Sequence, residues 1–306
     1  MNRSKYLVND TTSKHSSRLI HAMDDWKNPL KDFIAKPEGV FGSVATIKTG
    51  NVSICSDDLD LEFEIPFDDD MEPNEADITV YNLSDTTINN LKKGASITVE
   101  AGYKGDTGVV FSGFISKRET KHEGADKITT LKCVDDATKK TLDELTFKKN
   151  TKASVILKAL IDKTGIPCKV FKIRRDHTYE NETKISGDLF ENIKKYAEVC
   201  GISVFVSKGK IYARHITEGD NINFTVEADT GMIGSPEAYT EEVTAEDFSE
   251  TINGYDVTML LQHRMTTAAI ISLNSKVAKG SFRVRSGSHT FNESEAVTKI
   301  KVMPNS

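Results

Sequence analysis

The sequence predicts an α+β fold that is mainly β, in which two β domains flank a small α/β module. Three observations support this class. Short strand-like segments separated by turn signals recur before residue 145 and again after residue 217. The stretch between them contains two runs of apolar residues with helical spacing. The length of 306 residues leaves room for more than one domain. We therefore divide the chain into an N-terminal arm (1–39), a first β domain (40–145), an α/β module (146–216) and a second β domain (217–306).

The arm is polar and weakly periodic, with a helix expected near residues 17–34. The first β domain is predicted from strands at 44–47, 52–55, 58–65, 78–81, 97–101, 109–116 and 127–134. A short helix is expected after Ser84, whose hydroxyl can accept a free backbone amide of the first turn, and Gly94 is expected to end it. Strands at this spacing are typical of a sandwich or a barrel.

The predicted strand 58–65 has the clearest pattern in the chain. Its apolar residues are Leu59, Leu61, Phe63 and Ile65, and they alternate with Asp58, Asp60, Glu62 and Glu64. Because side chains alternate across a strand, the apolar set should face the core and the acidic set should lie on the opposite face. Those four acids are the candidate functional residues of the chain.

The α/β module is predicted from two amphipathic helices, at 153–161 and 187–200, which Gly165 and Gly201 end. Short strands are expected at 168–173, 202–206 and 211–215. The second β domain should contain strands at 223–227, 255–261, 270–273, 281–285 and 297–302, with residues 228–252 forming a loop.

Charge is unevenly distributed along the chain, whose net charge is −6. Residues 57–77 include eleven Asp or Glu and no Lys or Arg, whereas residues 148–175 include nine Lys or Arg and one acid. The net negative charge argues against specific nucleic-acid binding, which needs a basic surface. The segregation suits docking between subunits or a lumen of one sign, and two solvated faces on different modules are the alternative.

Motifs for catalysis and metal binding are missing from the sequence. It contains no HExxH, no P-loop and no Gly-x-Ser-x-Gly elbow, and its histidines lack metal-ligand spacing. The acids Asp68–Asp70 lack the alternation and the glycine of a calcium loop. Four separated cysteines fit neither a disulfide framework nor a zinc site and should pack as small apolar side chains. We expect no catalytic residue, metal or cofactor, although a pair of carboxylates for glycoside hydrolysis is left open.

No apolar run is long enough to span a bilayer, so we expect no membrane anchor. The first residues lack the apolar stretch of a secretory signal, and we expect the chain to remain in the bacterial cytoplasm unless another apparatus carries it.

The order of motifs in the first β domain resembles the baseplate hub proteins of phage tails and phage-tail-like particles. This family includes the late-control D proteins and the N-terminal parts of tail-associated lysins. The resemblance lies in the run Ile78-Thr79-Val80-Tyr81-Asn82-Leu83-Ser84, in Ala101-Gly102-Tyr103, and in Phe111-Ser112-Gly113-Phe114. The module with Thr164-Gly165-Ile166-Pro167 is similar to the central insert of the family, and Gly280-Ser281-Phe282-Arg283-Val284 with His289 is similar to its closing strands.

The resemblance implies a structural protein with two tube-type β-barrel domains. Such hubs are homotrimers that form a pseudo-sixfold ring and adapt the tail tube to the central spike. The implied partners are therefore further copies of the chain, the tail tube protein, the central spike protein, the tape-measure protein and baseplate wedge proteins. The implied location is the tail baseplate of a virion or a phage-tail-like particle, assembled in the bacterial cytoplasm.

Two hypotheses about function follow. The chain is a structural baseplate hub or, alternatively, a cell-wall-degrading enzyme of the tail that uses a pair of acids within residues 57–77. In the first case we expect Asp58, Asp60, Glu62 and Glu64 to line the channel of the ring. The alternatives are that these acids lie on an ordinary outer surface or that they contact the basic residues Lys148–Arg175.

Overall fold

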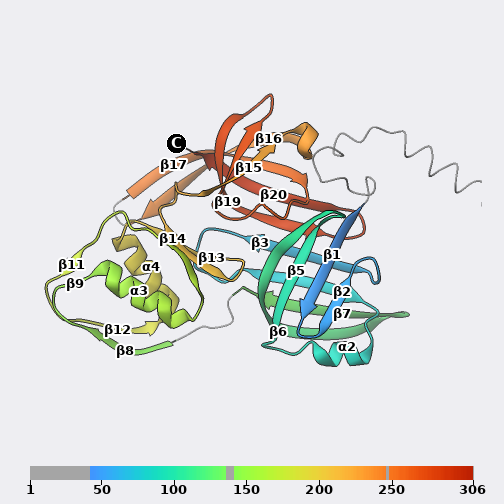
Figure 1. Cartoon of the computed structure of the whole chain (residues 1–306), viewed down its shortest axis with the longest axis horizontal. Helices are drawn as coiled ribbons and strands as arrows, with labels where there is room; N and C mark the ends of the chain where they lie inside the picture. Colours follow the sequence, from blue (N-terminus) through green and yellow to red (C-terminus); the bar gives the residue numbers. More distant parts are fainter. Residues whose placement is uncertain (1–41, 136–140, 246–247, 306) are drawn as a thin grey trace, which may run out of the picture.

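The computed structural model describes residues 42–135, 141–245 and 248–305. The predicted arm (1–39) and its helix lie outside the described residues. The fold is α+β and mainly β, as predicted (Figure 1).

Strands of both β regions form one 13-stranded sheet, with a main path in the order β16-β17-β20-β19-β3-β4-β7-β6-β5-β1-β2 and β15 and β18 attached beside β19. In chain order, the strands of the first region are β1 (Ser43–Thr49), β2 (Val52–Cys55), β3 (Leu61–Phe67), β4 (Glu75–Tyr81), β5 (Ser96–Tyr103), β6 (Asp106–Glu123) and β7 (Asp126–Val134). Those of the second are β15 (Asp220–Val226), β16 (Met232–Ala245), β17 (Phe248–Leu260), β18 (Ala269–Asn274), β19 (Lys279–Phe291) and β20 (Ala296–Pro304).

The two β regions are joined by backbone pairing between β3 and β19, whose register places Phe63 opposite Phe291 and Ile65 opposite His289. The rings of Phe63 and Phe291 stack with their centroids 5.5 Å apart. Within the described residues the path of strands is open, from β16 to β2, so backbone pairing inside one chain does not close the predicted barrels.

The first β region is built around the apolar side of β3. Leu61, Phe63 and Ile65 are all at most 4% exposed, and Leu59 packs partly buried against the same core. The short helix α2 (Asp85–Asn90) begins after Ser84, whose hydroxyl accepts the amide of Thr87, as predicted. The helix ends at Leu91, and Gly94 takes the left-handed conformation in the loop that follows.

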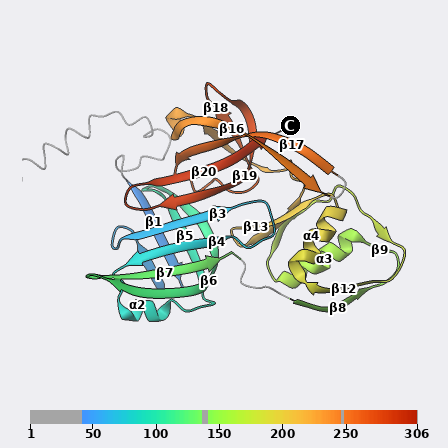
Figure 2. The same ribbon diagram turned by 180° about the vertical axis from the view of Figure 1, so that it is seen from behind.

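The α/β module contains α3 (Ala153–Thr164) and α4 (Leu189–Val199), which pack on the three-stranded sheet β10 (Cys168–Phe171), β14 (Lys210–Arg214) and β13 (Ser203–Ser207). Figures 1 and 2 both show it at one end of the molecule, beside the second β region. Two further strand pairs frame it: β8 (Thr141–Phe147) with β12 (Thr183–Asp188), and β9 (Thr151–Lys152) with β11 (Thr178–Tyr179). The left-handed Gly165 ends α3, and Asp188 caps α4 by accepting the amides of Phe190 and Glu191.

Three predictions about elements were wrong. Residues 228–252, predicted as a loop, belong largely to β16 and β17, which form a long antiparallel hairpin. The strand predicted from Asp58 begins only at Leu61, and Asp58 lies in a turn. The cysteines do not all pack as apolar side chains, because Cys168 is exposed, whereas Cys133 and Cys200 are buried.

Candidate assembly surface

The four candidate acids lie along the exposed face of the sheet and the turn that leads into it. Glu62 and Glu64 alternate with the buried residues of β3, as predicted. The amide of Tyr81 donates to the backbone oxygen of Asp60 at 2.9 Å, so the pairing with β4 continues one residue beyond the strand. Asp58 belongs to the preceding turn. The structure therefore places two of the four acids on the strand face and the other two just before it.

The neighbouring strands give this face mixed charge. Glu64 lies opposite Asp77 of β4, and Asp77 lies opposite Lys132 of β7, whose Nζ is 2.9 Å from Asp77 Oδ1. Hydrogen bonding to Asp77 raises the pKa of Lys132. On β6, Lys117 lies opposite Lys132 and forms an ion pair of 2.6 Å with Glu119. The acidic stripe predicted from sequence thus extends onto Asp77 of β4 and meets basic residues on β7 and β6.

Within the described residues, two unlike free edges bound the run of strands that carries this face, and the sheet itself continues past β6 to β5, β1 and β2. Eight strands, from β16 through β3 to β6, run side by side, and β16 pairs only with β17. At the other end, β6 pairs with β5 up to Phe114 and then continues to Glu123 paired only with β7. Figure 2 shows this hairpin extending past the neighbouring strands. Free strand edges offer unpaired amide and carbonyl groups to another strand, so both are candidate contact surfaces.

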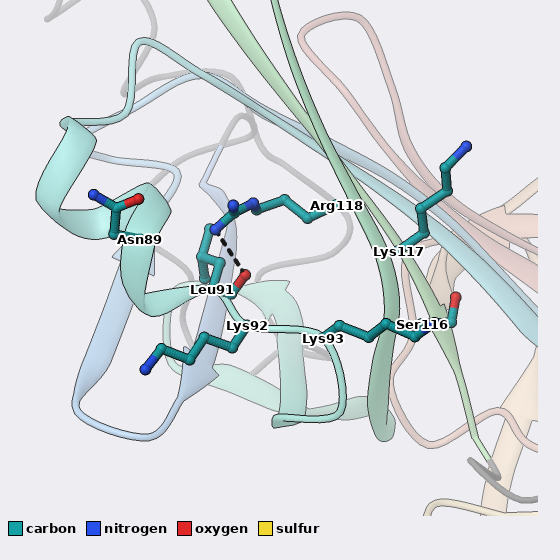
Figure 3. Close-up of a pocket in the computed structure, with 7 residues that line it drawn as sticks. All are labelled: Asn89, Leu91, Lys92, Lys93, Ser116, Lys117 and Arg118. Carbon is teal, nitrogen blue, oxygen red and sulfur yellow. Dashed lines mark hydrogen bonds between the residues drawn. The ribbon is translucent and has the colours of Figure 1, made fainter.

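A basic hollow of about 390 Å³ lies where β6 leaves β5 (Figure 3). Its lining residues are Asn89, Leu91, Lys92, Lys93, Ser116, Lys117 and Arg118. The guanidinium of Arg118 turns toward the end of α2, where it donates to the backbone oxygens of Ile88 and Leu91. Sequence reasoning missed this hollow because Lys92 and Arg118 come together only through the packing of α2 against β6.

A buried charge cluster ties the end of β3 to β19. Asp69 Oδ2 lies 3.0 Å from Nη1 of Arg283, which is fully buried, and Asp69 Oδ1 lies 3.4 Å from Nη2 of Arg285. Arg285 also pairs with Glu241 of β16 at 2.9 Å. In the run Asp68–Asp70, considered above as a calcium loop, the central carboxylate therefore binds two arginines.

The loop 262–267 joins all three parts of the chain. Arg264 binds the carboxylate of Asp106 through both terminal nitrogens, at 2.7 and 2.6 Å, and His263 Nε2 is 3.1 Å from the same carboxylate. The hydrogen bond from Arg264 lowers the pKa of Asp106. From the α/β module, Lys208 Nζ donates to the backbone oxygen of His263 at 2.7 Å, and burial lowers the pKa of Lys208 to about 8.

Neither a metal site nor a membrane-spanning helix is found in the described part of the chain. In residues 42–135, 141–245 and 248–305, no three His, Cys, Asp or Glu side chains are grouped so that they could hold a metal ion. None of the helices in the described part of the chain has the length and apolar character needed to cross a bilayer.

Solved structures with this fold include phage tail proteins and a component of a type VI secretion system. The tail protein from Neisseria meningitidis MC58 superposes with a TM-score of 0.61 at 9% identity, covering 87% of this chain and 97% of that one. The 43 kDa tail protein of prophage MuSo2 from Shewanella oneidensis gives 0.60 at 9% identity, covering 85% and 97%. The E. coli protein c3393, a type VI secretion component described as structurally similar to the T4 tail proteins gp27 and gp5, gives 0.59 at 11% identity, covering 85% and 77%. The predicted resemblance to phage tail proteins is confirmed at the level of the fold.

Sequence comparison adds a family. No curated protein matches the chain significantly. The family model described as the Alg8 N-terminal domain matches residues 65–233, from β3 through the α/β module to the start of β16. Because this match spans more than half of the 306 residues, the chain belongs to the Alg8 N-terminal domain family.

Proposed function

We propose that the chain is the structural baseplate hub of a phage tail or phage-tail-like particle, in which three copies form a ring between the tail tube and the central spike. The observation that carries this proposal is the run of eight strands from β16 to β6, which within the described residues has one unpaired edge on β16 and another on the outer part of β6. The fold shared with phage tail proteins supports a place in a tail.

A ring of copies would cover both free edges, β16 and the outer part of β6, with the same contact. A long free edge is an aggregation hazard unless it is covered, and head-to-tail contact would cover the β6 edge of each copy with the β16 edge of the next. Such a heterologous contact closes into a ring when the rotation per copy is right and otherwise runs on as a filament. Two β regions per chain would then give a pseudo-sixfold ring from three copies.

In this arrangement the exposed face of the sheet lines the channel, because its other face is buried in the core. Asp58, Asp60, Glu62 and Glu64 would then lie in the lumen, along which the tape-measure protein passes. The tail tube protein and the spike protein would contact opposite rims of the ring, and wedge proteins its outside.

The test is the mass of the assembly in solution. Light scattering and sedimentation of the purified chain, alone and co-expressed with the spike protein of the same particle, should give a trimer in at least the second case. Each interface should bury more than about 2,000 Å², as in obligate assemblies. A chain that stays monomeric or dimeric with both preparations would overturn the ring.

A further inference from the structure

In the part of the chain that the structure describes, the basic hollow beside α2 is lined by unpaired lysine side chains, and hydrogen bonds hold the backbone that carries them. Lys92 and Lys93 are exposed, and no hydrogen bond or ion pair of their ammonium groups occurs within the described residues. The wall is held by Arg118 at the end of α2 and by the amide of Gly94, which donates to Ile115 of β6 at 2.7 Å. The hollow therefore presents positive charge directly beside the open edge of β6.

The opposite edge of the sheet carries the complementary charge. Met232–Ala245, the whole of β16, contains Glu237, Glu241 and Glu242 and no Lys or Arg. Glu241 pairs with Arg285, whereas Glu237 lies directly opposite another acid, Asp256 of β17. Like charges facing each other across two strands are destabilising. Lys301 of β20 lies opposite Asp256 on its other side and offsets part of this repulsion, whereas a cation from outside the chain would act on Glu237 at the free edge.

The two edges carry net charges of equal magnitude and opposite sign. Residues 116–123 of β6, with Lys92 and Lys93, contain five basic residues and two acids, for a net charge of +3. The β16 strand carries −3. Contact between two β6 edges or two β16 edges would therefore be repulsive, and only contact between one of each is attractive.

We propose that the hollow is the docking site for the β16 edge of a second copy of this chain, with Lys92 and Lys93 facing the glutamates Glu237 and Glu242. This inference rests on the proposed ring and adds to it the contact that selects which edges meet. The charge pattern disfavours a two-fold dimer through like edges and favours head-to-tail contact.

Charge reversal on each side tests the contact. The variants are Lys92→Glu with Lys93→Glu, Glu237→Lys with Glu242→Lys, and the combination of all four. The matched control is Lys276→Glu with Lys279→Glu, which reverses two exposed lysines near the β18–β19 turn. Circular dichroism verifies that each variant folds, and sedimentation velocity over a concentration series gives the dissociation constant of the assembly.

Each double reversal should raise that dissociation constant by about tenfold or more, and the fourfold variant should recover most of the loss because the charges are exchanged across every contact. The control should behave as wild type. Carbodiimide coupling of a mixture of light and heavy-isotope chains should join Lys92 or Lys93 to Glu237 or Glu242 of the other isotope.

A failure of the docking proposal can be distinguished from a failure of the proposed ring. If the wild-type chain assembles and neither reversal weakens it, the copies meet elsewhere and the docking proposal is wrong while the ring stands. A wild-type chain that never self-associates, with or without the spike protein, overturns both. If the lysine reversal impairs only the binding of a different tail protein, that protein occupies the hollow and a second copy does not.

Discussion

Asp69 has a different role from the one that its neighbours in the sequence indicate. In the run Asp68–Asp70 it looks like part of a solvated acidic loop, yet its carboxylate binds two arginines of β19 in the interior. Arg283 lies 214 residues further along the chain, so no local pattern could connect them. The same holds for Asp106 and Arg264, which are 158 residues apart. Contacts of this kind depend on the tertiary arrangement of the strands.

Replacing Asp69 with Asn should lower the free energy of unfolding by about 3–5 kcal/mol, because the fully buried Arg283 would keep its charge without a charged partner. Urea denaturation followed by circular dichroism measures the change. Asp58→Asn is the control, since Asp58 is exposed in a turn and should change stability by less than about 0.5 kcal/mol. Equal effects of the two substitutions would show that the buried pair contributes little.

At the scale of elements, prediction succeeded where the apolar pattern was regular. The spacing of Ile156, Leu157, Leu160 and Ile161 predicted α3, and these residues are fully buried. The alternation in β3 predicted which of its side chains are exposed. Prediction failed for β16 and β8. Both strands are polar, and each is held in place by backbone hydrogen bonds to a partner strand, β17 for β16 and β12 for β8, which the pattern of side chains does not reveal. Neither free edge could be recognised from sequence for the same reason.

The cap of α4 gives a test at this scale. Asp188→Ala should destabilise the α/β module by about 1 kcal/mol, because the carboxylate accepts the amides of Phe190 at 2.9 Å and Glu191 at 3.0 Å. Faster hydrogen exchange should be confined to the first turn of α4 and its packing partners. Glu180→Ala, at an exposed position between β11 and β12, is the matched control. Unchanged exchange in α4 would show that the cap is dispensable.

For the whole molecule, the separation of charge is stronger than the local runs indicated. Residues 146–216 contain fifteen Lys or Arg and seven Asp or Glu, a net charge of +8, so the rest of the chain carries −14 to reach the total of −6. The acidic face of β3 and the basic module therefore belong to different parts of the chain. The sequence could predict this separation of charge. It could not predict that the two β regions share one sheet.

The channel hypothesis is tested by Asp60→Lys with Glu62→Lys. If this face lines the lumen, the ring and the particle should still assemble, and injection or release should be impaired because cargo no longer passes a repelling wall. Particle counts by electron microscopy and an infection or killing assay measure the two outcomes. Asp162→Lys with Glu182→Lys reverses two exposed acids of the α/β module as a control. Loss of the trimer with a folded monomer would instead make this face an interface.

The loop 262–267 has a mechanical consequence. Besides Asp106 and Lys208, it holds Ser207 of β13 through Thr266, at 2.7 Å, and the backbone of Asp68 through Thr267, at 2.8 Å. Six consecutive residues thus connect the α/β module to both β regions at one point. Because hydrogen bonds of this one loop connect the module to both β regions, a force that displaced the module would be transmitted to the sheet through the loop.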